Sequence, residues 1–97
     1  MFIIVTYDVK ADRTEKYRKM LSRYLVHQQN SVFAGLITGS RRRAIDKDLR
    51  RLLMTGDKVC IFEVENRHNI DASEMTREGK IVASRPLSEL VEKSIVL

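Results

Sequence analysis

An apolar run that ends in a carboxylate constrains this chain more than any other feature. Residues 2–7 read Phe-Ile-Ile-Val-Thr-Tyr, and Asp8 follows directly. β-Branched and aromatic residues in such a run predict a strand held in a sheet. The carboxylate at the end of the strand is then fixed in position but stays near water, which suits a hard cation such as Mg²⁺. Aspartate is also a common turn residue, so the alternative is that Asp8 only begins the turn that follows.

Length and composition indicate one small domain. The chain has 97 residues, of which 43% are hydrophobic, and no apolar run approaches the roughly 20 residues that span a membrane. The apolar start lacks a basic flank and is too short for a signal peptide, so we expect a cytoplasmic protein with no membrane contact. The single cysteine, Cys60, has no partner for an internal disulfide and lies in an apolar run, where we expect it to fill the core.

The charge of the chain is unevenly distributed. Residues 1–53 carry 12 Lys and Arg against 5 Asp and Glu, whereas residues 54–97 carry 6 against 8. A basic half on a small domain favours a polyanionic partner, and nucleic acid is the usual one. The alternative is a solvated surface that is merely rich in lysine and arginine.

Strands and helices are expected to alternate along the chain. The predicted elements are a strand at 2–9, a helix at 13–26, extended chain at 27–38, a helix at 41–54, a strand at 57–65 and a short strand at 81–83. The first helix is expected to begin at a capping box, with Asp12 as N-cap and Glu15 reaching back, and Ser40 is expected to cap the second. One apolar stripe is expected on the first helix, formed by Tyr17, Met20, Leu21, Tyr24 and Leu25. The extended segment forms either a hairpin that turns near residues 29–30 or a bent strand broken at Gly35.

This order of elements predicts an α+β protein, a ferredoxin-like βαββαβ sandwich in which two helices cover one face of an antiparallel sheet. Both faces of the sheet are apolar, because Phe2 and Ile4 alternate with Ile3, Val5 and Tyr7. The second face therefore needs a cover, and the simplest is the sheet of another copy in a twofold homodimer.

The C-terminal part is expected to complete that dimer. Residues 1–80 are predicted to form the ferredoxin-like domain, and residues 81–97 an extra strand and tail. The last three residues, 95–97, are Ile-Val-Leu and are expected to pair with an edge of the partner's sheet. The alternative is that this tail folds back over its own sheet.

Three arginines begin the second predicted helix, where cations oppose the helix macrodipole. Residues 41–43 are Arg-Arg-Arg, and nothing local is expected to offset them, so a phosphate would relieve their repulsion. The alternative is a solvated face that Asp46 and Asp48 partly neutralise. The candidate nucleic-acid-binding residues, including weaker clusters elsewhere, are Lys10, Arg13, Lys16, Arg41, Arg42, Arg43, Lys47, Arg67 and Arg77.

The same helix is expected to have a basic and an apolar side. The basic side carries Arg43, Lys47, Arg50 and Arg51, and the apolar side carries Ile45, Leu49, Leu52 and Leu53. Contacts from the basic side to phosphates would hold a duplex without reading its bases.

Several catalytic arrangements are disfavoured. His27 and His68 are isolated, Ser31 has no base partner nearby in the sequence, and the four glycines are scattered rather than gathered in a phosphate loop. Phe33 and Phe62 lack the sequence context of the aromatic pair on an RNA-recognition sheet.

A single carboxylate per chain is a poor metal site. Asp8 has no second carboxylate, histidine or cysteine at metal-ligand spacing, and the nearest acid, Asp12, reads as a cap. Two copies of Asp8 across a dimer axis would hold one Mg²⁺ better. A metal beside a bound phosphodiester would suit hydrolysis by an activated water.

Several of these segments, taken together, resemble a known family. They are Tyr7–Asp8, Arg18 and Lys19, Gln29, the run 31–35 (Ser-Val-Phe-Ala-Gly) and the run 57–62 (Asp-Lys-Val-Cys-Ile-Phe). At this spacing residues 1–65 are similar to the Cas-two family, the small CRISPR-associated proteins of spacer acquisition. The chain departs from the family at Ala34, where an acidic residue is frequent, and it matches poorly after Asn66.

The resemblance implies a ferredoxin-like homodimer that joins the Cas-one integrase, captures double-stranded DNA and inserts it into the CRISPR array. For some members it implies a metal-dependent endonuclease on RNA or DNA. The strand-end aspartate, here Asp8, is then the catalytic residue and the Mg²⁺ ligand. In other members the subunit serves mainly as a scaffold for DNA.

Two functions therefore compete: a subunit whose basic residues hold duplex DNA, and a phosphodiesterase that uses Asp8 and Mg²⁺. A more distant alternative is a regulatory or toxin-type nuclease of the same fold outside CRISPR systems. We favour the first, because one carboxylate is less evidence than a broad basic surface.

Overall fold

The computed structural model describes residues 1–65, 69–75 and 81–86, and for residues 71–75 and 81–86 it describes the backbone alone. In chain order the elements are β1 (Phe2–Asp8), a 3₁₀ turn (Ala11–Arg13), α1 (Thr14–Leu21), β2 (Val26–Gln29), β3 (Val32–Leu36), α2 (Gly39–Leu52), β4 (Lys58–Val64), β5 (Asp71–Met75) and β6 (Ile81–Pro86).

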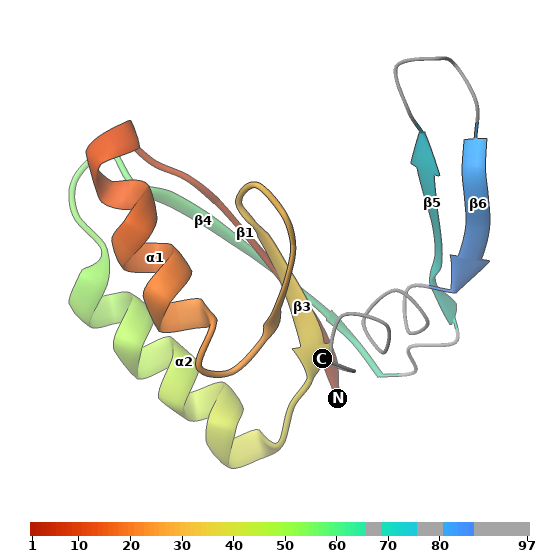
Figure 1. Ribbon diagram of the computed structural model, residues 1–97. Coiled ribbons are helices and arrows are strands. Elements are labelled where there is room, and N and C mark those ends of the chain that lie inside the picture. The colour runs from red at the N-terminus through yellow and green to blue at the C-terminus, as the bar shows by residue number, and fades with distance from the viewer. Residues whose placement is uncertain (66–68, 76–80, 87–97) are drawn as a thin grey trace.

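The first four strands form one antiparallel sheet in the order β2-β3-β1-β4. Both helices lie on the same face of this sheet (Figure 1). The ferredoxin-like α+β arrangement predicted from the order of elements is therefore confirmed. The expected strand near residue 81 is present as β6, which pairs antiparallel with β5 in a separate two-stranded sheet.

The hairpin β2–β3 resolves the two alternatives for the extended segment. Asn30 lies in the turn with a φ of 40°, a left-handed conformation that asparagine tolerates well. Gly35 does not break a strand but lies inside β3. There a Cβ atom would come within 3.3 Å of the Leu25 side chain, so the glycine allows β3 to pass close to that residue.

Both helix starts differ from the expected caps. A 3₁₀ turn occupies residues 11–13, so Asp12 lies too early to cap α1, and Glu15 pairs with Arg18 instead of reaching back. The cap of α2 is Thr38, whose Oγ1 accepts a hydrogen bond from the Arg41 N–H at 3.3 Å. Ser40 is already inside the helix and does not cap it.

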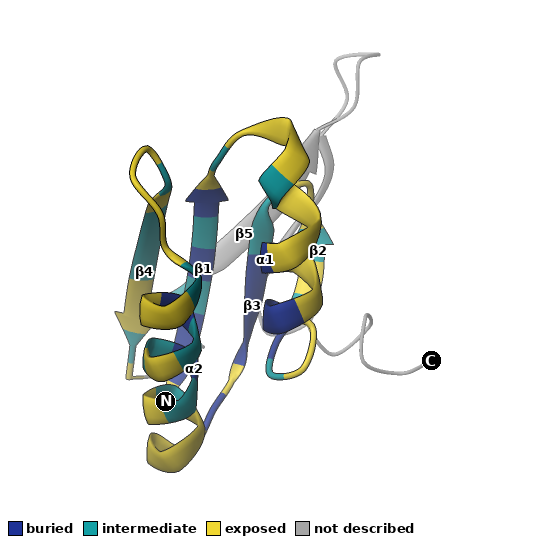
Figure 2. Ribbon diagram, turned by 90° about the vertical axis from the view of Figure 1, so that its left-hand side faces the viewer, coloured by how far each residue is buried: buried dark blue, intermediate teal, exposed yellow. Residues whose placement is uncertain are grey.

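A core between the helices and the sheet holds the fold together. Tyr17 and Leu21 of α1 and Ile45 of α2 are fully buried against Ile3 and Phe33 of the sheet. Figure 2 shows the buried residues on β1, on β3 and on the inner sides of both helices. The predicted apolar stripes are confirmed at these positions. The stripe on α2 ends one residue earlier than expected, because Leu53 lies beyond the helix and is 42% exposed.

The sheet face without helices is also apolar, as predicted. Phe2 and Ile4 lie on it, with Leu36 paired opposite Phe2 and Phe62 paired opposite Ile4. Phe2 is buried in a second small cluster that Ile70 packs against, whereas Leu36 is 56% and Phe62 is 54% exposed. This face therefore leaves large apolar side chains in contact with water. Among the described residues, no helix is both long enough and apolar enough to cross a bilayer.

Candidate functional site

Asp8 ends β1, and its side chain is exposed. Its neighbour in the sheet is Lys58, the first residue of β4. Within the described part of the chain, no group of three or more histidine, cysteine, aspartate or glutamate side chains is placed to hold a metal ion. Asp8 offers the oxygen donor that Mg²⁺ prefers, and an ion held there would keep most of its ligands as water or take them from another molecule.

A cavity lies where the chain turns after β1, beside the turn between α2 and β4. It encloses about 280 Å³ and is lined by Lys10, Asp12, Arg13, Lys16, Met54, Thr55, Gly56 and Asp57. The structure therefore brings the three predicted basic residues of this region together around one cavity. Lys10 and Lys16 are exposed, whereas Arg13 is partly buried.

Arg13 is held inside the protein by Asp57. Its Nε donates to both Asp57 carboxylate oxygens, at 3.0 and 3.2 Å, and its Nη2 donates to the Leu52 carbonyl at 2.7 Å. The Tyr17 hydroxyl donates to the same carboxylate at 2.6 Å, and the Met54 N–H donates to it at 3.2 Å. The Asp57 side chain is only 3% exposed.

These contacts compensate the positive charge of Arg13. The hydrogen bonds from Arg13, and then from Tyr17, hold the pKa of Asp57 below its ordinary value, so the carboxylate stays ionised beside the guanidinium. The charge of Arg13 is thus neutralised internally. The contacts of Arg13 fix α1 to the turn before β4. Phosphate binding by Arg13 stays a prediction. Because Arg13 and Asp57 are far apart in the sequence, no local pattern could have indicated this pair.

The three arginines at the start of α2 differ in their contacts. Arg42 forms ion pairs with Asp46, one turn later, and with Glu63 of β4, at 2.8 Å. The expectation that nothing offsets these arginines is therefore wrong for Arg42. Arg41 donates to the Arg23 carbonyl at 2.8 Å, and its guanidinium lies 5.4 Å from the centre of the Tyr24 ring.

The outward side of α2 remains cationic. Arg43, Lys47 and Arg50 are spaced by four and three residues, so they form one row along the helix, and all three are exposed. None of them forms an ion pair with another residue that the structure describes. We call these three residues the α2 basic row.

Other predicted residues contribute less or cannot be placed. Arg67 and Arg77, and also His68, lie outside the described residues. His27 stacks on Phe33 in the β2–β3 hairpin, which fits a structural role. Arg23, which was not among the candidates, is exposed in the turn after α1 and faces α2 across a groove. The first helix was expected to reach residue 26, whereas α1 ends at Leu21.

Known proteins of one family are similar to most of this chain. A family profile described as CRISPR associated protein Cas2 matches residues 1–70. A protein of Haloferax volcanii named CRISPR-associated endoribonuclease Cas2 is 42% identical over 71 residues, which are 73% of this chain and 83% of that protein. A protein of the same name from Pyrococcus furiosus is 30% identical over 92 residues, which are 94% of this chain and all of that protein.

Solved structures agree with these relatives. One described as a crystal structure of cas2 has a TM-score of 0.61 and 35% identity, and the match covers 64% of this chain and 71% of the other. The crystal structure of Streptococcus pyogenes Cas2 at pH 6.5 has a TM-score of 0.60 and 25% identity, and the match covers 66% and 86%. The profile match ends near Ile70, close to the end of the four-stranded domain.

Proposed function

Since this chain belongs to the Cas2 family of CRISPR-associated proteins, we propose that it is the DNA-holding subunit of spacer acquisition. In this proposal a homodimer joins the Cas-one integrase and positions double-stranded DNA for insertion into the CRISPR array. The integrase carries out the strand transfer, and this chain supplies the surface that fixes the duplex.

The α2 basic row is the observation that carries the proposal. Arg43, Lys47 and Arg50 are exposed and form no ion pair with the described part of the chain, so their charges stay available to a polyanion. A row about 10 Å long, at 1.5 Å per residue over seven residues, can follow a duplex backbone and neutralise several phosphates. Such contacts hold DNA of any sequence, as capture of foreign DNA requires.

The exposed apolar face supports the homodimer. Phe62 and Leu36 present more than half of their surface to water on the side of the sheet without helices. A second copy offers the same apolar surface, so a twofold pairing of the two sheets buries both patches at once. The helices then face outward on each copy and leave both basic rows accessible to DNA.

A second candidate function is cleavage of a phosphodiester at Asp8. The relatives cited above carry the name endoribonuclease, and Asp8 is an exposed carboxylate at a fixed strand end. Bound Mg²⁺ would supply an activated water. Asp8, together with its copy in a dimer, would hold the ion, while Lys10 and Lys16 would hold the neighbouring phosphates. We place this function second, because the described part of the chain holds no group of three or more side chains placed to bind a metal ion.

Duplex binding tests the first proposal. Fluorescence anisotropy of a labelled DNA duplex, without divalent metal, compares the wild type with the double variant Arg43→Gln/Lys47→Gln. Because two phosphate contacts are lost, we expect binding to weaken roughly tenfold and the slope of log K against log salt to fall by about 1.8.

A matched control removes the same two kinds of charge elsewhere. In Arg18→Gln/Lys58→Gln, Arg18 is already paired with Glu15, and Lys58 lies on the sheet rather than on α2. The control variant is expected to bind the DNA duplex with nearly the affinity of the wild type. If both double variants lose affinity equally, only net charge matters and the α2 basic row is not the DNA site.

A further inference from the structure

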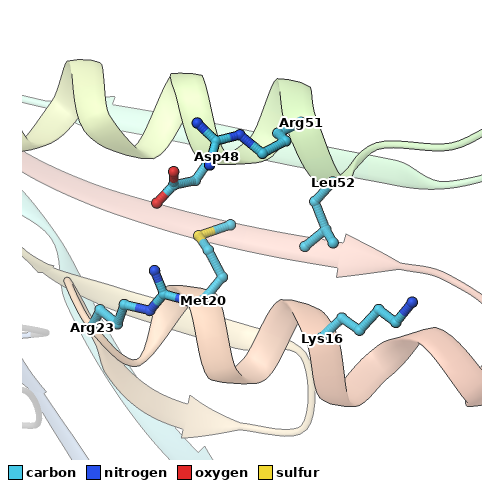
Figure 3. Close-up of a pocket in the computed structure, with 6 residues that line it drawn as sticks. All are labelled: Lys16, Met20, Arg23, Asp48, Arg51 and Leu52. Carbon is cyan, nitrogen blue, oxygen red and sulfur yellow. The ribbon is translucent and has the colours of Figure 1, made fainter.

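A groove between α1 and α2 combines charged residues outside the α2 basic row with Met20 and Leu52, which also pack in the core. It encloses about 190 Å³ and is lined by Lys16, Met20, Arg23, Asp48, Arg51 and Leu52. Figure 3 shows Met20 rising from α1 and Leu52 reaching down from α2, with Lys16 at one end of the groove and Arg23 and Asp48 at the other. The groove thus has an apolar floor between charged ends.

The charges around the groove favour an anion. Lys16, Arg23 and Arg51 are all exposed, and none forms an ion pair with another described residue. Three cations against the single carboxylate of Asp48 leave a net charge of +2. A phosphate monoester, which carries roughly −1.5 to −2 charges near pH 7, matches this value.

The carboxylate of Asp48 restricts which chemical groups a ligand of this groove can carry. The Tyr24 hydroxyl donates to its Oδ2 atom at 2.7 Å and so holds the carboxylate between the helices. Its Oδ1 atom has no hydrogen-bond partner among the residues that the structure describes. A bare phosphate would be repelled by this oxygen, whereas a ligand that brings an N–H donor would gain a charge-assisted hydrogen bond.

The apolar floor of the groove suits a flat apolar group, such as an aromatic ring. Met20 is only 5% exposed, and the half-buried Leu52 lies across from it. A methionine thioether makes favourable contacts with aromatic rings. A ligand with a phosphate at one end, an aromatic ring in the middle and an amine on that ring would use every group that lines the groove.

We propose that this groove binds a nucleoside monophosphate unit whose base carries an exocyclic amine. The base lies against Met20 and Leu52, its amine donates to Asp48, and the phosphate pairs with the cations. The unit is either a free nucleotide or the phosphorylated end of a DNA strand, since both present the same groups. The proposal does not depend on duplex binding, because none of the α2 basic row lines the groove.

Titration of the ¹⁵N-labelled chain, followed by NMR, tests this site. The probes are dCMP, dTMP, which lacks an exocyclic amine, and inorganic phosphate. We expect dCMP to shift the amide signals of α1 and of the C-terminal half of α2, and to bind about tenfold more tightly than dTMP, the worth of one hydrogen bond to a charged group. Inorganic phosphate is expected to bind more weakly than either nucleotide.

Two variants connect the binding to named groups, and the spectra report whether each folds. Asp48→Asn is expected to reduce the preference for dCMP over dTMP several-fold, whereas Asp46→Asn, on the same helix but outside the groove, preserves it. Arg51→Gln is expected to weaken the binding of both nucleotides to the same extent. The proposal is overturned if dTMP or phosphate binds as tightly as dCMP, if Asp48→Asn keeps the full preference, or if the groove signals do not move.

A further arm distinguishes the two sources of the ligand. The tetranucleotide d(CTTT) is titrated with and without a 5′-phosphate. If the phosphorylated form alone gives shifts that depend on Asp48, a strand end is the ligand. If dCMP gives these shifts and neither tetranucleotide does, the ligand is a free nucleotide.

Discussion

The buried carboxylate of Asp57 connects two separate parts of the described structure. It accepts hydrogen bonds from Arg13, Tyr17 and the Met54 N–H, and so joins α1 to the turn that leads into β4. This turn borders the cavity that Lys10 and Lys16 also line. Removing one partner from such a buried pair leaves the other without compensation.

Replacement of Asp57 by asparagine is therefore expected to destabilise the fold. Asp57→Asn should lower the Tm at pH 7 by roughly 10 °C, because a buried ion pair and its charged hydrogen bonds are lost. Asp12→Asn, the same change at an exposed residue of the 3₁₀ turn, should leave the Tm nearly unchanged. Thermal unfolding followed by circular dichroism measures both, and equal Tm values for the two variants would contradict this role.

The pH dependence of that difference follows from the lowered pKa of Asp57. A carboxylate whose pKa is lower in the folded state stabilises the protein above its unfolded pKa, and this contribution is lost as the pH falls through the folded pKa. The gap in Tm between wild type and Asp57→Asn should therefore be full at pH 7 and shrink below about pH 4.

At the scale of elements, local sequence patterns predicted the buried faces of the strands and helices. Alternation in β1 and the stripes on α1 and α2 placed the core correctly, because burial follows directly from side-chain period. The caps were wrong, since the 3₁₀ turn and Thr38 take the positions assigned to Asp12 and Ser40. The pairing of Arg42 with Asp46 was part of the alternative of a solvated face. The more distant partners, Asp57 of Arg13 and Glu63 of Arg42, were not predictable, because the fold alone brings them close.

The exposed apolar face of the sheet leads to a test of the homodimer. Phe62→Glu places a charge in each half of a twofold interface and removes about 1.5–3 kcal/mol of apolar burial from each copy. The dimer dissociation constant is expected to rise at least a hundredfold, measured by sedimentation velocity. Met54→Glu changes a side chain that is 61% exposed but lies on the turn after α2, and it should leave the dimer intact. Equal effects of both variants would place the interface elsewhere.

At the scale of the whole molecule, the fold separates surfaces of different chemistry. The helix layer carries the α2 basic row, the opposite sheet face is apolar, and Asp8 lies at an end of the sheet between them. The sequence indicated each surface through residues of one kind at a regular spacing. Which of the basic residues keep an uncompensated charge was decided only by the folded chain, which neutralises Arg13 and Arg42 and leaves the α2 basic row exposed.

Spacer integration into a CRISPR array, reconstituted with the cognate Cas-one integrase, tests the central claim most directly. The assay compares the wild type with Asp8→Ala and with Arg43→Gln/Lys47→Gln. If the chain acts by holding DNA, Asp8→Ala supports as much integration as the wild type does. The double variant then supports roughly tenfold less integration at physiological salt. Loss of integration by Asp8→Ala, with dimer and duplex binding intact, would contradict the account and assign the Asp8 carboxylate a part in the reaction.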